Sequence, residues 1–240
     1  MSYSTLLFLP FAPMLFGAQC ILTLVLIKGE ICPGQRGRIH KVLPIIAILW
    51  LITALYHYVA GNARVGGIVG TSGIVGIALL YFYSQVQTKK TRDRGPLWVL
   101  LLADVLALLC VGWQMMVQSS VAGGLAIVTI VLLLGALLAH LLLTTARTRL
   151  QAFHRILPFT GIIAAMLFVL TILLQAFSLD ESTLTLATTS LLSGFALMII
   201  AIGIWCWSLF TRQPAHKMTL LVVMAVMLSS VALNLDLFYR

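Results

Sequence analysis

Residues 121–143 read VAGGLAIVTIVLLLGALLAHLLL, an apolar run in which His140 is the one ionisable side chain. An α-helix needs about 20 such residues to cross the roughly 30 Å hydrocarbon core of a bilayer. Seven further runs of this kind lie at about 5–27, 41–60, 65–85, 96–118, 156–178, 183–210 and 217–237. The pattern predicts an all-α integral membrane protein with eight transmembrane helices.

The composition excludes a soluble domain of this size. Of the 240 residues, 61% are hydrophobic and only 9% are charged. So few charges cannot cover the surface that a folded soluble chain exposes to water. The alternation of apolar and polar residues that is typical of a membrane β-barrel is absent, so we expect helices as the spanning elements. The gaps between the runs are too short for a soluble domain. If the chain belongs to an enzyme, a partner subunit must therefore hold most of the chemistry.

The basic residues predict the orientation. Thirteen of the fifteen Lys and Arg residues fall in the first, third, fifth and seventh gaps between the runs. Cytoplasmic loops carry such an excess, so we expect both chain ends on the outer side of a bacterial inner membrane. The net charge of +9 then reflects topology and contact with anionic lipid rather than binding of nucleic acid. The residues are Lys28, Arg36, Arg38, Lys41, Lys89, Lys90, Arg92, Arg94, Arg147, Arg149, Arg155, Arg212 and Lys217.

A short motif occurs twice, each time at the start of a run. Residues 40–44 read HKVLP and residues 154–158 read HRILP, with an offset of 114 residues, close to half the chain. Both copies enter the membrane from the predicted cytoplasmic side. The repeat therefore predicts two four-helix halves, residues 1–118 and 119–240, related by a parallel repeat within a single transmembrane domain.

Ionisable side chains inside a membrane span are costly and often functional. Asp104 and His140 lie in the inner halves of two consecutive runs, so a hydrogen bond between them is a reasonable expectation. Such a pair would be either a proton path to the cytoplasm or, as we favour, a structural clamp. His57 lies near the outer surface and His140 near the inner one, so they cannot ligate one haem. We expect no metal and no covalently bound cofactor.

A second polar group is predicted at the outer surface. His57 lies near the outer end of the second run and Tyr58 follows it, while Asn62 and Arg64 stand in the next short loop. Such side chains can bind a quinone carbonyl or take a quinol proton, with His57 as the catalytic residue. The alternative is an aromatic belt with an arginine that reaches to the surface. The third run opens with small residues that suit tight helix packing or the approach of a flat quinone ring: Gly66, Gly70 and Gly73.

The start of the chain carries the most specific motif. Residues 16–20 read FGAQC and residues 26–30 read LIKGE. This opening resembles the membrane anchor subunit family of bacterial dimethyl sulfoxide reductases. His57 stands where that family has a histidine near the outer end of its second span, and residues 64–66, RVG, resemble the stretch that follows. Weaker similarities lie at 113–117, 155–158 and 237–239.

The resemblance implies a function. It implies the membrane anchor and quinol-binding subunit of a molybdopterin and iron–sulfur oxidoreductase complex in anaerobic respiration. Menaquinol would be the substrate, and its electrons would pass to an iron–sulfur subunit that lies on the outer face with a molybdopterin catalytic subunit. The anchor in this family carries no haem. His57 would take or relay a quinol proton, while Asn62 and Arg64 would hold the head group or dock the iron–sulfur subunit.

Two departures from that family concern the quinol site. The family commonly has a glutamate shortly after the Arg-Val-Gly stretch, where this chain has residues 70–73, GTSG. The family's closing helix usually has a Gly-Glu-x-x-Gly-Arg pattern, where this chain has residues 230–235, SVALNL, with Asp236 as the acidic residue that follows. Anchoring of partner subunits therefore carries over better than quinol chemistry.

Two other functions stay open at this point. A small multi-pass transporter built from two repeats would need a polar site near mid-membrane, where the sequence offers Asp104, Gln114 and Gln175. A non-catalytic membrane scaffold would have kept the fold and lost the quinol site. Copurification of redox subunits, with and without quinol oxidation, would separate the three functions.

Overall fold

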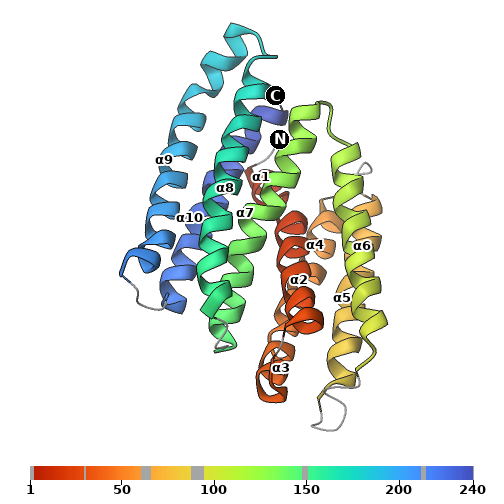
Figure 1. Cartoon of the computed structure of the whole chain (residues 1–240). Helices are drawn as coiled ribbons and strands as arrows, with labels where there is room; N and C mark the ends of the chain where they lie inside the picture. The colour runs from red at the N-terminus through yellow and green to blue at the C-terminus, as the bar shows by residue number, and fades with distance from the viewer. Residues whose placement is uncertain are drawn as a thin grey trace.

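The computed structural model describes residues 3–29, 31–60, 66–87, 95–147, 151–211 and 215–239, and over these ranges the chain is helical. Figure 1 shows a bundle of long helices connected by short loops. The elements are α1 (Tyr3–Phe8), α2 (Phe11–Lys28), α3 (Pro33–His40), α4 (Leu43–Val59), α5 (Gly66–Gln85), α6 (Leu97–Met116), α7 (Val121–Thr145), α8 (Gln151–Ala176), α9 (Glu181–Thr211), α10 (Lys217–Leu235) and the 3-10 helix η2 (Asp236–Tyr239).

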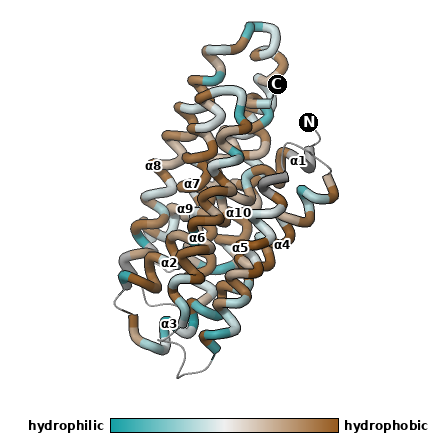
Figure 2. Tube along the Cα trace, turned by 90° about the vertical axis from the view of Figure 1, so that its right-hand side faces the viewer, coloured by the Kyte–Doolittle hydropathy of each residue, from teal (hydrophilic) through white to brown (hydrophobic). Residues whose placement is uncertain are grey.

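The protein is an all-α integral membrane protein. Seven segments are long and apolar enough to cross a bilayer, and α5, with 20 residues, is a further long helix of the bundle. The outward-facing side chains are apolar; Phe210, for example, is 82% exposed and Ile199 is 70% exposed. Figure 2 shows hydrophobic residues along the middle of the bundle and hydrophilic residues towards its ends. An apolar exterior of this kind is stable against lipid and not against water.

The long helices form two groups of four. In the N-terminal ring, each of α2, α4, α5 and α6 packs against its two neighbours in that order, and α6 closes the ring on α2. In the C-terminal ring, α7, α8, α9 and α10 pack in the same way, and α10 closes on α7. The two rings lie side by side in Figure 1 and meet mainly where α2 packs against α7.

The contact between α2 and α7 is made by backbone. Gly17 and Gly135 face each other at the crossing, and a Cβ built on Gly135 would lie 2.6 Å from Gly17 Cα. A Cβ on Gly17 would lie 2.2 Å from the carbonyl oxygen of Val131. Small residues allow this approach, which in lipid replaces the hydrophobic effect with van der Waals contact between helices.

The first span is broken, whereas the sequence predicts one helix over residues 5–27. α1 ends at Phe8 and α2 begins at Phe11. Pro13 has no N–H, so it cannot donate to the carbonyl of Leu9 as a residue in a continuous helix would. Gln114 of α6 donates its Nε2–H to the Leu9 carbonyl oxygen at 2.9 Å instead. A neighbouring helix thus satisfies a carbonyl that lipid could not.

A short helix that sequence analysis did not predict, α3, precedes α4. Its arginines bind carbonyl oxygens at the ends of two long helices. Arg36 Nη2 donates to the Leu26 carbonyl of α2 at 3.2 Å, and Arg38 Nη1 donates to the Arg147 carbonyl, just after α7, at 3.0 Å. Cations near the C-terminal ends of helices are favourable because unpaired carbonyls gather there.

The basic side chains in the described part of the chain gather at one end of the bundle. This end, here called the basic end, holds α3, the α7–α8 connection and the start of α10 (Figure 1). The opposite end, here called the far end, holds the α6–α7 and α8–α9 connections and the C-terminus. The basic residues at the basic end are Lys28, Arg36, Arg38, Lys41, Arg147, Arg155 and Lys217.

Candidate functional site

A chain of hydrogen bonds joins three helices inside the N-terminal ring. The indole Nε1–H of Trp50 on α4 donates to Gln19 Oε1 on α2 at 2.9 Å, and Gln19 Nε2–H donates to Asp104 Oδ1 on α6 at 2.7 Å. An indole nitrogen can only donate a hydrogen bond, so it fixes which end of the Gln19 amide faces Trp50. The amide nitrogen of Gln19 therefore faces the carboxyl group of Asp104.

The three residues meet because they lie at one depth. Gln19 stands nine residues before the basic end of α2, and Trp50 and Asp104 each stand seven residues after the basic ends of α4 and α6. At 1.5 Å per residue, each lies about 10–14 Å along its helix. Sequence analysis identified Asp104 but assigned no role to Gln19, because an amide carries no charge. Their matched distances from the basic gaps were the available signal.

The C-terminal ring has its own polar contact. Trp205 of α9 donates its Nε1–H to His140 Nδ1 of α7 at 2.9 Å. The Trp205 ring lies directly on Gly161 of α8, where a Cβ would be 2.1 Å from a ring carbon. Because the indole can only donate, His140 must accept at Nδ1, which requires a neutral imidazole.

The predicted hydrogen bond between Asp104 and His140 is wrong. Asp104 accepts a hydrogen bond from Gln19 within the N-terminal ring, and His140 accepts one from Trp205 within the C-terminal ring. α6 and α7 are consecutive in the chain, but these two side chains point into different rings. Sequence neighbourhood predicted the helix contact without predicting which faces the two helices would share.

The predicted outer cluster is described only in part. His57 is buried on α4, on the same face as Trp50 and Thr53, and its ring lies edge-on to Tyr56 with centroids 5.5 Å apart. Tyr58 is 73% exposed, so the structure does not bring it together with His57. Asn62 and Arg64 lie outside the described residues, and Gly66 is the first residue of α5.

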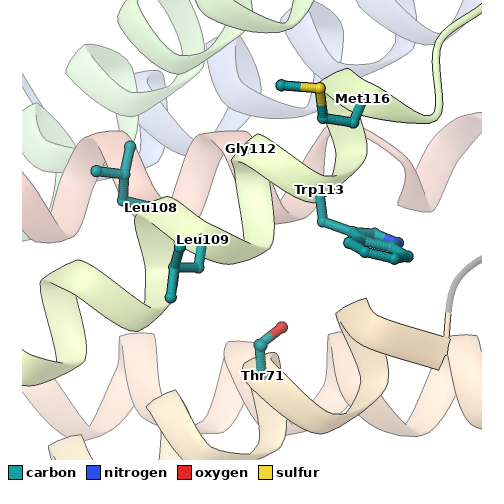
Figure 3. A pocket seen from close by; sticks show the side chains of 6 residues that line it. All are labelled: Thr71, Leu108, Leu109, Gly112, Trp113 and Met116. Atoms are coloured by element: carbon teal, nitrogen blue, oxygen red, sulfur yellow. The ribbon is translucent and has the colours of Figure 1, made fainter.

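A groove that sequence analysis missed lies between α5 and α6, towards the far end. Its volume is about 440 Å³, within the range of about 300–1,000 Å³ that is usual for small-molecule sites. In Figure 3, Thr71 rises from α5 towards α6, whose Trp113 side chain borders the same space. The lining residues are Thr71, Leu108, Leu109, Gly112, Trp113 and Met116.

The groove is apolar and faces the lipid. Leu109 is 58% exposed and Met116 is 86% exposed. A Cβ built on Gly112 would meet nothing within 4 Å, so this glycine leaves the space open. The Thr71 hydroxyl and the Trp113 indole are the polar groups of the lining. The arrangement suits an apolar ring with a few oxygen atoms that enters from the bilayer. His57 does not line the groove.

Comparison with known proteins gives a family and one curated relative. The model of a family described as "integral membrane domain" matches residues 3–235. A Haemophilus influenzae protein with the name "Uncharacterized protein" is 35% identical over 149 residues, which is 61% of this chain and 54% of that protein. The chain thus spans about half the length of the curated relative that it matches. No solved structure matches the chain.

These findings correct the resemblance to dimethyl sulfoxide reductase anchor subunits, which is wrong. The matching family covers nearly the whole chain under a different description, and the relative's name does not indicate a reductase anchor. The FGAQC stretch has a structural role in this fold instead. Gly17 makes the α2–α7 crossing and Gln19 holds Asp104 and Trp50. The chain belongs to the integral membrane domain family.

Proposed function

We propose that the protein binds a quinol from the bilayer in the groove between α5 and α6. The observation that carries this proposal is the lipid-open, apolar groove with one hydroxyl and one indole in its lining. Quinols dissolve in the hydrocarbon core and reach a site of this kind without crossing water. An aromatic side chain such as Trp113 favours a stacked ring, and a hydroxyl such as that of Thr71 suits a ring oxygen.

The proposal includes a topology with eight transmembrane helices and both chain ends outside. The described basic residues gather at the basic end, which the positive-inside rule assigns to the cytoplasm of a bacterial inner membrane. α5 crosses with the other seven long helices. The groove then lies near the outer face, because Thr71 is five residues from the far end of α5 and Trp113 three residues from the far end of α6.

Oxidation of a quinol releases two electrons and two protons, so the proposed function needs acceptors for both. A partner subunit at the outer face would take the electrons, and an iron–sulfur cluster is a carrier that accepts them singly. His57 is the candidate proton acceptor of the outer half, although it lies on α4 and not in the groove lining. Asn62 and Arg64 stand in the sequence between His57 and Thr71.

The experiment measures quenching of tryptophan fluorescence by a short-chain menaquinone in the purified protein. Gly112→Leu fills the groove without a backbone clash, since nothing lies within 4 Å of its Cβ. The matched control is Gly124→Leu on α7, which has the same open space away from the groove. We expect saturable quenching in the wild type and the control, and at least about tenfold weaker binding in Gly112→Leu. Equal affinity in all three proteins would refute the groove site.

A second pair of variants tests where the quinone binds along α6. Trp113→Phe should remove most of the quenching signal, because the indole borders the groove (Figure 3). Trp98→Phe should not, although Trp98 is also lipid-exposed on α6, at its basic end. If the two substitutions reduce quenching equally, the quinone partitions into lipid and does not occupy a site.

A small transporter is the second candidate function. It is favoured by the hydrogen-bonded Asp104 within the bundle and by the equivalent packing order of the two rings. That order is what two repeats, residues 1–118 and 119–240, would produce. For a transporter, Asp104→Asn would abolish solute uptake into vesicles while Gly112→Leu would leave it intact. A scaffold would show neither quinone binding nor uptake.

A further inference from the structure

We propose that Asp104 is a reversible proton-binding site within the N-terminal ring. It is a different site from the groove between α5 and α6, and it does not depend on quinol binding. Its ligand is a proton, exchanged with water at the basic end of the bundle. The hydrogen-bonded pair Gln19 and Trp50 holds the carboxyl group in position for this exchange.

The geometry accommodates both forms of the carboxyl group. The Gln19 amide presents its N–H to Asp104 Oδ1, because its oxygen is engaged by Trp50. An oxygen of the carboxylate can accept this hydrogen bond, and so can the carbonyl oxygen of the neutral acid. The amide therefore needs no rearrangement when the proton binds or leaves, and Asp104 keeps its place on α2 in both states.

No counter-charge holds Asp104 as an anion. The carboxyl group is half-buried, and no ion pair joins it to any residue in the ranges that the structure covers. A lone charge within the hydrocarbon is costly, and a neutral acid is not. A carboxyl group held by one neutral amide is therefore suited to carry a proton. Trp50, on the third helix of the network, is neutral as well.

The titratable side chains on the helices packed against α6 do not supply such a charge. Cys20 on α2 interacts electrostatically with Asp104 but can become only neutral or negative. Lys28, also on α2, stands nine residues beyond Gln19, about 13 Å along the helix. His140 on α7 is hydrogen-bonded to Trp205 of the other ring. The remaining groups are the phenols of α5, Tyr81 and Tyr83.

A hydroxyl group stands between Asp104 and the basic end. Thr23 is one turn beyond Gln19 on the same face of α2, and its Oγ1 is buried without an ordinary hydrogen bond, although it acts on the Asp104 carboxyl. It is the first polar group on the path to Lys28, five residues further on. On release, the carboxyl O–H bond breaks, the electron pair stays on the oxygen, and the proton passes to water at the basic end.

Infrared spectroscopy tests the proposal on the purified full chain in lipid nanodiscs. A protonated acid gives a C=O band that a carboxylate lacks. The chain has only six Asp and Glu residues, so single substitutions can assign the band. Asp104→Asn keeps the shape of the side chain and removes the proton. The control is Asp180→Asn, because hydrogen bonds from Ser182 and Thr183 hold the pKa of the exposed Asp180 below its ordinary value.

We expect an acid band at neutral pH that is present in the wild type and in Asp180→Asn, and absent in Asp104→Asn. The band should convert to carboxylate at alkaline pH and return when the pH is restored. Gln19→Leu should move the band to higher frequency, because the C=O group loses its donor; this variant also tests the site if Asp104→Asn fails to fold. A band that is absent at neutral pH, independent of Asp104 or insensitive to pH while the protein stays folded would overturn the proposal.

Discussion

Replacing Gly135 by alanine should force the two rings of the bundle apart. The added methyl group would lie 2.6 Å from Gly17 Cα and 2.9 Å from the Gly17 carbonyl carbon. Carbon atoms in good contact are about 3.5–4.0 Å apart, so α2 and α7 must separate by about 1 Å. Both obstructing atoms belong to backbone, so no side chain can rotate to make room. Overpacking of this kind costs about 1–3 kcal/mol.

The assay is thermal unfolding of the purified protein, followed by size-exclusion chromatography of the fraction that stays folded. A loss of about 2 kcal/mol corresponds to a fall of roughly 4–8 °C in melting temperature for a chain of this length. Gly124→Ala is the matched control, because Gly124 is also on α7 and its Cβ would meet nothing within 4 Å. We expect the control to melt within about 1 °C of the wild type, as is usual away from packed sites.

The double variant Gly17→Ala with Gly135→Ala gives a sharper test. Once one methyl group has separated the helices, the second should cost less, so the two losses should not add. If Gly135→Ala melts with the control, or if the two losses add fully, the rings are not joined through this crossing and the packing argument fails.

Three further outcomes are expected. Gln114→Leu removes the donor to the Leu9 carbonyl and should cost about 1–3 kcal/mol in the same thermal assay, the penalty for a buried group left unpaired. Trp205→Phe removes the donor to its histidine partner and should lower the melting temperature, whereas Trp207→Phe on the same helix, 67% exposed, should not; equal effects would contradict the assignment. Asp180 precedes α9, and its pKa is lowered by hydrogen bonds from the Ser182 and Thr183 side chains. Its contribution to stability should therefore be complete above the ordinary value of 3.8 and lost as the pH falls through the lower folded value. The melting difference between wild type and Asp180→Ala should narrow over that range, and a constant difference would contradict this.

Sequence analysis predicted the helices better than their ends. The run at 96–118 corresponds to Leu97–Met116, because apolar length is read directly from composition. It missed α3, since Pro33–His40 is a polar segment that is helical only where its arginines reach the ends of other helices. It also missed the break at Leu9 and Pro10, although Pro10 and Pro13 were visible signals.

The candidate sites were harder to predict because they depend on which helix faces meet. Charge drew attention to Asp104 and His140, but the partners of these residues are the uncharged Gln19 and the indole of Trp205. Polar pairing in lipid is set by depth and by rotation about the helix axis, and only depth can be counted from a sequence. The groove at Gly112 exists because a side chain is missing, so no motif marks it.

The hydrogen bond from Gln114 to the Leu9 carbonyl has a consequence for biogenesis. Its two partners are 105 residues apart, so at about 5–20 residues per second the ribosome adds Gln114 roughly 5–20 s after Leu9. During that interval the first helix is already inserted with one carbonyl that its own chain cannot satisfy. Headgroups and water at the far end must serve it until α6 arrives. Closure of the N-terminal ring is therefore a late, post-insertion step, and the second half of the chain is translated while the first is still being sealed.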